Sequence, residues 1–187
     1  MKSSFIQKLF KKIPEIEGER ILLRRLRIAD ASDMYDYARR EQVTRYLLWS
    51  PHPNQDYTRQ YLSYVQGLYR DGAFYDWAIV DKESGRMIGT CGFPLITEAN
   101  NQAEVGYVLN PDFWGMGYAT EALGLLLSFA CKTLRLHRIE ARCFEHHAAS
   151  RRVMEKCGME YEGSLRDALL VKGRYETVAV YSILFKR

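Results

Sequence analysis

The sequence AEVGYVLNPDFWGMGYATEAL, residues Ala103 to Leu123, carries the clearest fold signal in the chain. Its first part has the apolar composition of a strand, and Pro111 follows soon after. Gly115 and Gly117 then precede a helical pattern of apolar residues that begins at Ala119. A glycine turn between a strand and a helix presents unpaired backbone N–H groups at the helix N-terminus, an arrangement that suits a phosphate group.

This glycine turn matches neither of two common nucleotide-binding patterns. It lacks the Gly-Lys-Ser/Thr ending of a P-loop. Thr120 stands where the dinucleotide fingerprint needs its last glycine, and no early βαβ unit surrounds it. Glycine allows a phosphate to approach the backbone closely, but short glycine patterns also occur in turns that bind nothing. The residues alone therefore leave two interpretations, a phosphate cradle and a plain strand-to-helix turn.

The rest of the chain predicts one mixed α/β domain in the order β-α-α-β-β-β-α-β-α-β-β. Asp30 is expected to cap the first helix and Gly158 to end the last one. A turn at residues 83–85 joins two strands into an antiparallel hairpin. The predicted strands cover residues 20–27, 74–81, 85–95, 103–109, 138–144, 160–170 and 174–185, and the predicted helices cover residues 30–39, 55–70, 119–134 and 150–156.

Length and composition exclude several classes of protein. The chain has 187 residues, of which 47% are hydrophobic and 27% charged, as expected for a single globular domain. No apolar run approaches the ~20 residues of a membrane-spanning helix. The cysteines lack CxxC spacing, so we expect free thiols in a reducing compartment and hence a cytoplasmic protein. They are Cys91, Cys131, Cys143 and Cys157.

The net charge of +4 is located in the N-terminal arm. Four lysines precede the first acidic residue, Glu15: Lys2, Lys8, Lys11 and Lys12. In the rest of the chain, basic and acidic residues are equal in number. A balanced body predicts no direct nucleic-acid binding. We therefore divide the chain into a basic extension, residues 1–14, and a domain, residues 15–187. The arm fits a short amphipathic helix that binds a membrane surface or an anionic partner. A packed or frayed extension is the favoured interpretation.

The segment quoted first is similar to motif A of the GNAT acetyltransferase superfamily, a strand followed by the pyrophosphate loop Q/R-x-x-G-x-G/A. Trp114 stands in the Q/R place, and Gly117 and Ala119 stand in the last two defined places. The later stretch SRRVMEKCGMEYEG, residues 150–163, resembles the next helix and strand of that family. The resemblance implies a mostly antiparallel mixed sheet, flanked by helices, in a single domain.

Both ends of the chain resemble one branch of this superfamily. Residues 18–38, GERILLRRLRIADASDMYDYA, and residues 170–185, LVKGRYETVAVYSILF, resemble the ribosomal-protein N-terminal (alanine/serine) acetyltransferases. The branch implies a protein N-terminus as the acceptor.

The resemblance implies that the chain binds acetyl-CoA and moves the acetyl group to a primary amine by direct attack, with no metal. Backbone N–H groups of the loop would hold the pyrophosphate, and the preceding strand would pair with the pantetheine. A backbone N–H of that strand would also stabilise the oxyanion. The implied cofactor-binding residues are Tyr107, Val108, Leu109, Trp114, Gly115, Met116, Gly117, Tyr118, Ala119, Thr120, His147 and Ser150.

An amine near neutral pH is mostly protonated, so a base must remove a proton before attack. Glu104 is the candidate, acting directly or through a water. It alternates with Val105 along the strand, which places the two side chains on opposite faces. The alternative for Glu104 is a solvent-facing carboxylate on a half-exposed strand.

Two positions depart from the family pattern. The usual tyrosine proton donor falls on Met154, which cannot donate. The N-terminal acetyltransferase branch uses a serine near the start of the same helix, and Ser150 matches it, although Ser150 also suits the helix N-cap. His147 stands where the family has an asparagine that contacts the cofactor. A base formed by His146 and His147 is one interpretation, and a surface loop pair is the favoured one.

Four aromatic residues are expected beside Glu104 around the acceptor: Tyr46, Trp49, Tyr75 and Trp77. Each also fits an ordinary core position. The sequence has no run of acidic residues of the kind that would indicate a polycationic substrate. The lack of such a run favours a protein N-terminus as the acceptor, for instance that of a ribosomal protein. Two alternatives stay open: a small-molecule amine such as an antibiotic, polyamine or metabolite, and a non-catalytic CoA-binding module. A homodimer is compatible with the sequence.

Overall fold

The computed structural model describes residues 4–185, and its strands form one sheet in the order β1-β2-β3-β4-β5-β6-β8-β7. β5 and β6 are parallel, and every other neighbouring pair is antiparallel. The strands are β1 (Ile16–Glu17), β2 (Ile21–Arg24), β3 (Asp76–Asp81), β4 (Met87–Thr97), β5 (Gln102–Leu109), β6 (Arg138–Phe144), β7 (Glu160–Val171) and β8 (Arg174–Leu184). The expectation of a mixed, mostly antiparallel sheet is confirmed.

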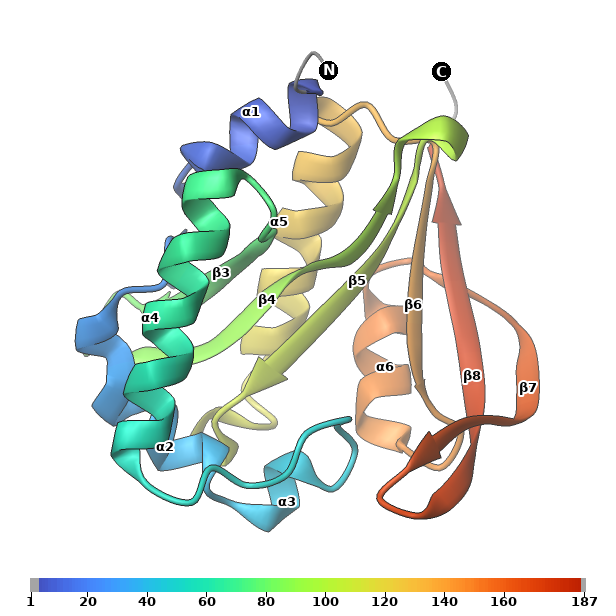
Figure 1. Cartoon of the computed structure of the whole chain (residues 1–187). Helices are drawn as coiled ribbons and strands as arrows, with labels where there is room; N and C mark the ends of the chain where they lie inside the picture. The colour runs from blue at the N-terminus through green and yellow to red at the C-terminus, as the bar shows by residue number, and fades with distance from the viewer. Residues whose placement is uncertain (1–3, 186–187) are drawn as a thin grey trace.

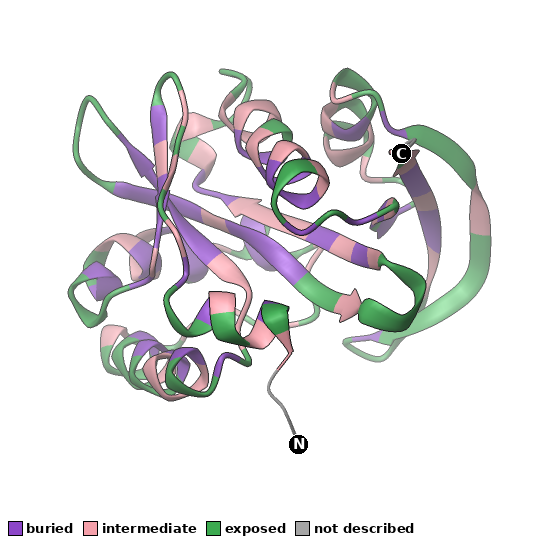
Figure 2. Ribbon diagram, turned by 90° about the horizontal axis from the view of Figure 1, so that it is seen from above, coloured by how far each residue is buried: buried purple, intermediate pink, exposed green. Residues whose placement is uncertain are grey.

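Helices cover both faces of this sheet, with α4 and α5 on opposite sides (Figure 1). The α-helices are α1 (Phe5–Lys11), α2 (Ala31–Ala38), α3 (Glu41–Thr44), α4 (Gln55–Asp71), α5 (Tyr118–Lys132) and α6 (Ala148–Lys156). Short 3-10 turns lie at η1 (Ile28–Asp30), η2 (Glu98–Asn100) and η3 (Pro111–Phe113). Figure 2 shows the central strands buried between the helices, whereas the edge strand β7 is largely exposed. Within residues 4–185, no helix has both the length and the apolar character of a membrane span.

Most predicted elements agree with the structure within a few residues, including the β3–β4 hairpin. The predicted helix over residues 55–70 is α4, which Gly72 ends in the left-handed region with φ +68°. Asp30 stands at the N-cap position of α2 but makes no capping bond there. Its carboxylate instead accepts hydrogen bonds from Arg24 at 2.7 and 2.9 Å and from the backbone N–H of Arg27.

The N-terminal arm packs into the core through α1. Phe10 is completely buried, and its ring lies 4.7 Å from that of Tyr75 and 5.3 Å from that of Trp77. Ile6 and Ile13 are also buried. The apolar face of α1 is therefore turned towards the protein, which is the packed arrangement. Lys2 lies outside the described residues, and a boundary between residues 14 and 15 stays a prediction.

β5 and β6 separate halfway along their length. Their pairing runs only from Gln102 with Arg138 to Val105 with Ala141. Beyond this point β5 remains paired with β4, and β6 with β8, while the two parallel strands diverge (Figure 1). The β6-facing backbone of residues 106–109 is thus left without a strand partner, and the glycine turn follows where β5 ends.

Candidate active site

The glycine turn ends in a set of free backbone donors. Gly115 and Gly117 adopt φ values of +76° and +84°, which other residues rarely adopt. The first bond that enters α5 runs from the N–H of Glu121 to the carbonyl of Gly117, at 3.0 Å. Among the described residues, no acceptor is recorded for the N–H groups of residues 115–120. Free donors at the N-terminus of a long helix suit a diphosphate.

Arg20, the residue before β2, holds this turn in place. Arg20 donates from Nη1 to the carbonyl of Met116 at 2.8 Å and from Nε to Glu121 at 3.0 Å, and it stacks over the ring of Tyr118. Trp114 is 46% exposed and donates from Nε1 to the carbonyl of Leu109 at 2.8 Å. Arg20 was not predicted from the sequence, because an arginine at the start of an apolar run has no distinctive spacing.

Tyr107 and Ser150 meet across the diverging strands. The Tyr107 hydroxyl lies 2.9 Å from Ser150 Oγ and donates to the Ser150 carbonyl at 3.1 Å. Burial raises the pKa of Tyr107 well above its usual range. The thiol of Cys143 also contacts Ser150, and burial raises its pKa to about 11. The pair places two hydroxyl groups beside the unpaired edge of β5.

The N-cap alternative for Ser150 is wrong. α6 begins at Ala148, and His147 occupies the N-cap position. Ser150 is therefore inside the first turn, where its hydroxyl is available to Tyr107. Met154 is completely buried on the same helix, so it packs in the core.

Glu104 lies where β5 and β6 separate. It pairs in register with Glu140, and Arg142 Nε lies 3.6 Å from its Oε2. Its side chain is 27% exposed. Burial raises the pKa of Glu104, an effect that Arg142 opposes and Glu140 increases. A half-buried carboxylate with a raised pKa fits a general base better than a solvated surface group does.

The segment after α3 packs on the loop that leads into α6. Tyr46 stacks on His147 with ring centroids 3.8 Å apart. Burial, with a smaller effect from His146, lowers the pKa of His147 to about 4, so this ring is neutral at pH 7. Lys172 in the β7–β8 turn donates to the carbonyl of Thr44 at 2.6 Å. These contacts bring α3 and the β7–β8 turn together beside the diverging strands (Figure 1).

One of the four expected acceptor aromatics belongs to the core. Trp77 is completely buried, donates to the carbonyl of Pro14 at 2.7 Å and contacts the ring of Phe129. Placing Trp77 at the acceptor is therefore wrong, because its ring fills the layer between the sheet and helices α1 and α5. Tyr75 is half-buried and packs on Phe10 of α1, so its place at the acceptor stays a prediction. Trp49 lies 5.3 Å from His52, in the segment between α3 and α4, and remains a candidate with Tyr46.

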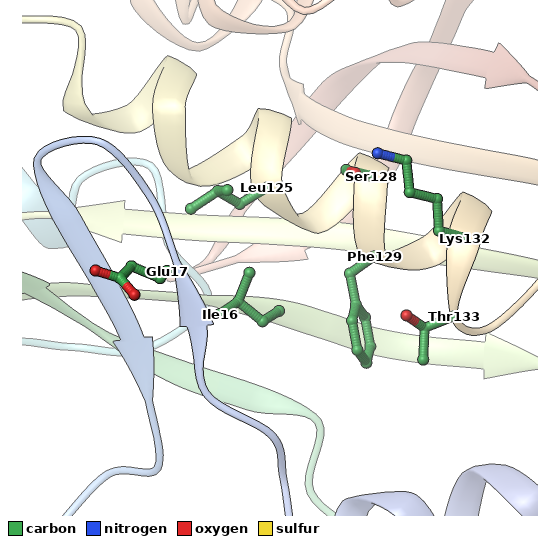
Figure 3. A pocket seen from close by; sticks show the side chains of 7 residues that line it. All are labelled: Ile16, Glu17, Leu125, Ser128, Phe129, Lys132 and Thr133. Atoms are coloured by element: carbon green, nitrogen blue, oxygen red, sulfur yellow. The ribbon is translucent and has the colours of Figure 1, made fainter.

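A surface hollow lies between β1 and α5 (Figure 3). It is lined by Ile16, Glu17, Leu125, Ser128, Phe129, Lys132 and Thr133. Because an α-helix rises 1.5 Å per residue, residues 128–133 are about 15–25 Å from the glycine turn. This end of the hollow is thus distant from the glycine turn, whereas Leu125 lies one helical turn from Glu121. In residues 4–185, no group of three or more His, Cys, Asp or Glu side chains is arranged to hold a metal ion.

Comparisons with known proteins agree with this geometry. A family described as an acetyltransferase (GNAT) domain matches residues 20–160. The uncharacterized N-acetyltransferase p20 of Bacillus licheniformis is 33% identical over 166 residues, which cover 89% of this chain and 93% of that protein. A GNAT-family acetyltransferase structure from Bacillus anthracis has a TM-score of 0.82 and 26% identity, covering 91% of this chain and 98% of that one. The ribosomal protein uS5-alanine N-acetyltransferase of Escherichia coli is 24% identical over 165 residues, covering 84% of each chain.

The chain therefore belongs to the GNAT acetyltransferase family. It is an acetyl-CoA-dependent N-acetyltransferase, and solved structures of the same fold hold coenzyme A or acetyl-CoA. The free N–H donors at the start of α5 and the unpaired edge of β5 fit the diphosphate and the pantetheine of that molecule.

Proposed function

We propose that this enzyme acetylates the α-amine of a peptide or protein N-terminus. The observation that carries the proposal is the position of Glu104, half-buried at the point where β5 and β6 separate. A base there can remove a proton from an amine that approaches the thioester. The acceptor class is supported by the relative from Escherichia coli, whose name gives an alanine of the ribosomal protein uS5 as its substrate.

The proposed reaction needs one proton acceptor and one stabilised oxyanion. Glu104 takes a proton from the ammonium form of the acceptor, directly or through a water. The free amine then attacks the thioester carbon, and a new C–N bond forms. A backbone N–H of residues 107–109 stabilises the negative charge on the carbonyl oxygen; one such donor contributes about 3 kcal/mol in well-studied enzymes. The nitrogen then loses its second proton to solvent, the C–S bond breaks, and CoA leaves as the thiolate.

The thiolate is proposed to leave beside Tyr107 and Ser150. A thiol has a pKa of roughly 8.5, so its thiolate is a fair leaving group without a strong acid. The raised pKa of Tyr107 makes loss of its proton unfavourable. The two hydroxyl groups would therefore stabilise the thiolate by hydrogen bonding, and the proton would come from solvent.

Acetyl-CoA is proposed to lie along β5 and the glycine turn. Backbone donors of Gly115, Met116, Gly117, Tyr118, Ala119 and Thr120 would hold the diphosphate, and Tyr107, Val108 and Leu109 would pair with the pantetheine. Trp114 and His147 would flank the cofactor, and Tyr46 and Trp49 would flank the acceptor. The four cysteines carry no disulfide, which supports a cytoplasmic location. A homodimer stays a prediction.

The proposal is tested by free-thiol release from acetyl-CoA in the presence of peptides or small amines. The panel holds N-terminal peptides with a free or a blocked α-amine, and polyamines and aminoglycosides. We expect release only with the free peptides, and loss of release in Glu104→Gln. Release with small amines alone would contradict the peptide acceptor. Binding of acetyl-CoA without release across the panel would contradict catalysis and favour a CoA-binding module.

A further inference from the structure

Asp76, the first residue of β3, carries a carboxylate that the described residues leave without a hydrogen bond or an ion pair. Its side chain is only partly exposed, and burial raises its pKa to about 6. Its backbone carbonyl, by contrast, accepts a short bond from the Tyr69 hydroxyl. Burying a carboxylate without a partner costs stability. A group kept at such a cost is a candidate for a role in binding.

The sheet register places Asp76 on the same face as Glu104. Asp76 pairs with Gly92 of β4, and Gly92 pairs with Gly106 of β5. Directly paired residues of antiparallel strands point to one face, and residues two apart on a strand also share a face. Glu104 is two residues from Gly106. The side chains of Trp77 and Tyr107 lie on the opposite face of the sheet. Asp76 and Glu104 therefore share the face covered by α4.

Gly92 and Gly106 lie between these carboxylates on the sheet and add no side chain of their own. A Cβ at position 92 would collide with Asp76 Oδ1, so the carboxylate occupies the space that a side chain would fill. A Cβ at position 106 would meet the ring of Pro94, at 3.6 Å. Between Asp76 and Glu104 the sheet surface is therefore formed by the two glycines and the ring of Pro94.

Among the described residues, no lysine or arginine forms an ion pair with Asp76; the guanidinium of Arg25 lies over the ring of Tyr69, 4.5 Å from its centre. Burial, with a smaller effect from the charge of Asp76, raises the pKa values of Tyr61, Tyr69 and Cys91, so all three side chains are neutral at pH 7. Arg142 contacts Glu104. Asp76 is thus left for a cation from outside the chain.

We propose that Asp76 binds a second positive charge of the amine acceptor, so that the preferred substrate is an N-terminal peptide with a basic side chain in its first two residues. This inference rests on the proposed function and names the substrate class of the same site. Neighbouring strands are about 4.8 Å apart, so Asp76 and Gly106 are separated by about 10 Å. A basic side chain near a peptide N-terminus spans that range.

The test compares peptides that differ only in charge. One series of peptides carries arginine at the first or second position, and the other carries citrulline there. The arginine side chain does not accept an acetyl group, and citrulline is its uncharged isostere. We expect kcat/KM to be at least about tenfold higher for the arginine peptides, as a charge-assisted hydrogen bond would give. Asp76→Asn should reduce this ratio to about one. Asp71→Asn, at an exposed site on α4, should keep the full ratio.

Two outcomes would overturn the subsite. One is equal turnover of the arginine and citrulline peptides by the unmodified enzyme; the other is an arginine preference that survives Asp76→Asn. If no peptide is acetylated, the proposed function is overturned instead. A binding measurement then tests whether Asp76 binds a cation. The carboxyl signal of Asp76, followed by carbon-13 NMR, should titrate at lower pH with arginine amide than with citrulline amide. Equal titration with the two amides would contradict the proposal.

Discussion

Asp76 imposes a pH-dependent cost on folding. Its folded pKa of about 6 lies above the ordinary value of 3.8, so the unfolded chain releases this proton first as the pH rises. Folding stability is therefore unaffected below pH 4, falls between pH 4 and 6, and carries the full cost above pH 6. Asp76→Asn should raise the free energy of unfolding by about 3 kcal/mol at pH 7 and by little at pH 3.5. Urea unfolding at the two pH values measures this, and an equal effect at both would contradict it.

Arg142 is expected to set the pH range in which Glu104 acts. Its guanidinium lies 3.6 Å from the carboxylate and opposes the rise of the Glu104 pKa that burial causes. A base loses activity as the pH falls through its pKa. Arg142→Gln should therefore move the acidic limb of the kcat/KM profile to higher pH. Arg166→Gln, on the exposed edge strand, should leave the limb in place; an unshifted limb in both variants would remove this role from Arg142.

At single residues, the sequence was informative where chemistry restricts the residue type. Alternation along the strand placed Glu104 on the face opposite Val105, and the structure keeps it there. The aromatic positions were ambiguous, because tryptophan suits a core and a binding wall equally. Only the contacts of Trp77 with α1 and α5 distinguish the two. Asp76 was not recognised, since its isolation depends on register with two glycines.

The glycine turn is braced by Arg20, which lies just before β2 and pairs with Glu121 of α5. Arg20 holds the carbonyl of Met116 away from the free N–H donors, and Glu121 fixes Arg20 in turn. Arg20→Gln should weaken acetyl-CoA binding about tenfold, because the turn loses its fixed geometry and a nearby positive charge. Calorimetric titration with CoA measures the change. Arg59→Gln breaks an exposed pair on α4 and should have no effect, and equal affinities in all three proteins would contradict the bracing role.

Helix α6 presents Ser150 to β5. Ser150→Ala should lower kcat about tenfold and leave the KM for acetyl-CoA nearly unchanged, because the hydroxyl is proposed to act only on the departing thiolate. Tyr107→Phe removes the partner hydroxyl and should give a similar loss, with little further loss in the double variant. Steady-state kinetics of the three variants gives the comparison. Additive losses would show that the two hydroxyl groups do not act as a pair.

Most elements were predictable because their periodicity or turn residues are local features of the chain. The start of α6 was placed two residues late, since a serine there satisfies the usual capping preference. α1 lacked a distinguishing pattern: alternating lysine and apolar residues suit a membrane surface and a protein core alike. The separation of β5 from β6 depends on pairing between distant strands, which single-strand composition does not encode.

The proposed cofactor edge and the proposed acceptor face belong to one sheet. Tyr107 and Ser150 lie on the side of α6, and Glu104 and Asp76 lie on the side of α4. The fold followed from the sequence because the motif of residues 103–123 fixes a strand, a turn and a helix in order. The acceptor chemistry could not be predicted from the sequence, because the carboxylates of β3 and β5 come to lie on one face only when the chain folds.

The assignment of Glu104 as the base is tested most directly by the single-turnover rate of acetyl transfer. This rate is measured across pH for the unmodified enzyme and for Glu104→Gln. With a free N-terminal peptide, we expect a rate that rises with pH through the raised pKa of Glu104. In Glu104→Gln the rate should be lower by about 10²- to 10⁴-fold and should follow only the titration of the acceptor amine. An unchanged rate and pH profile in Glu104→Gln would contradict the proposed mechanism.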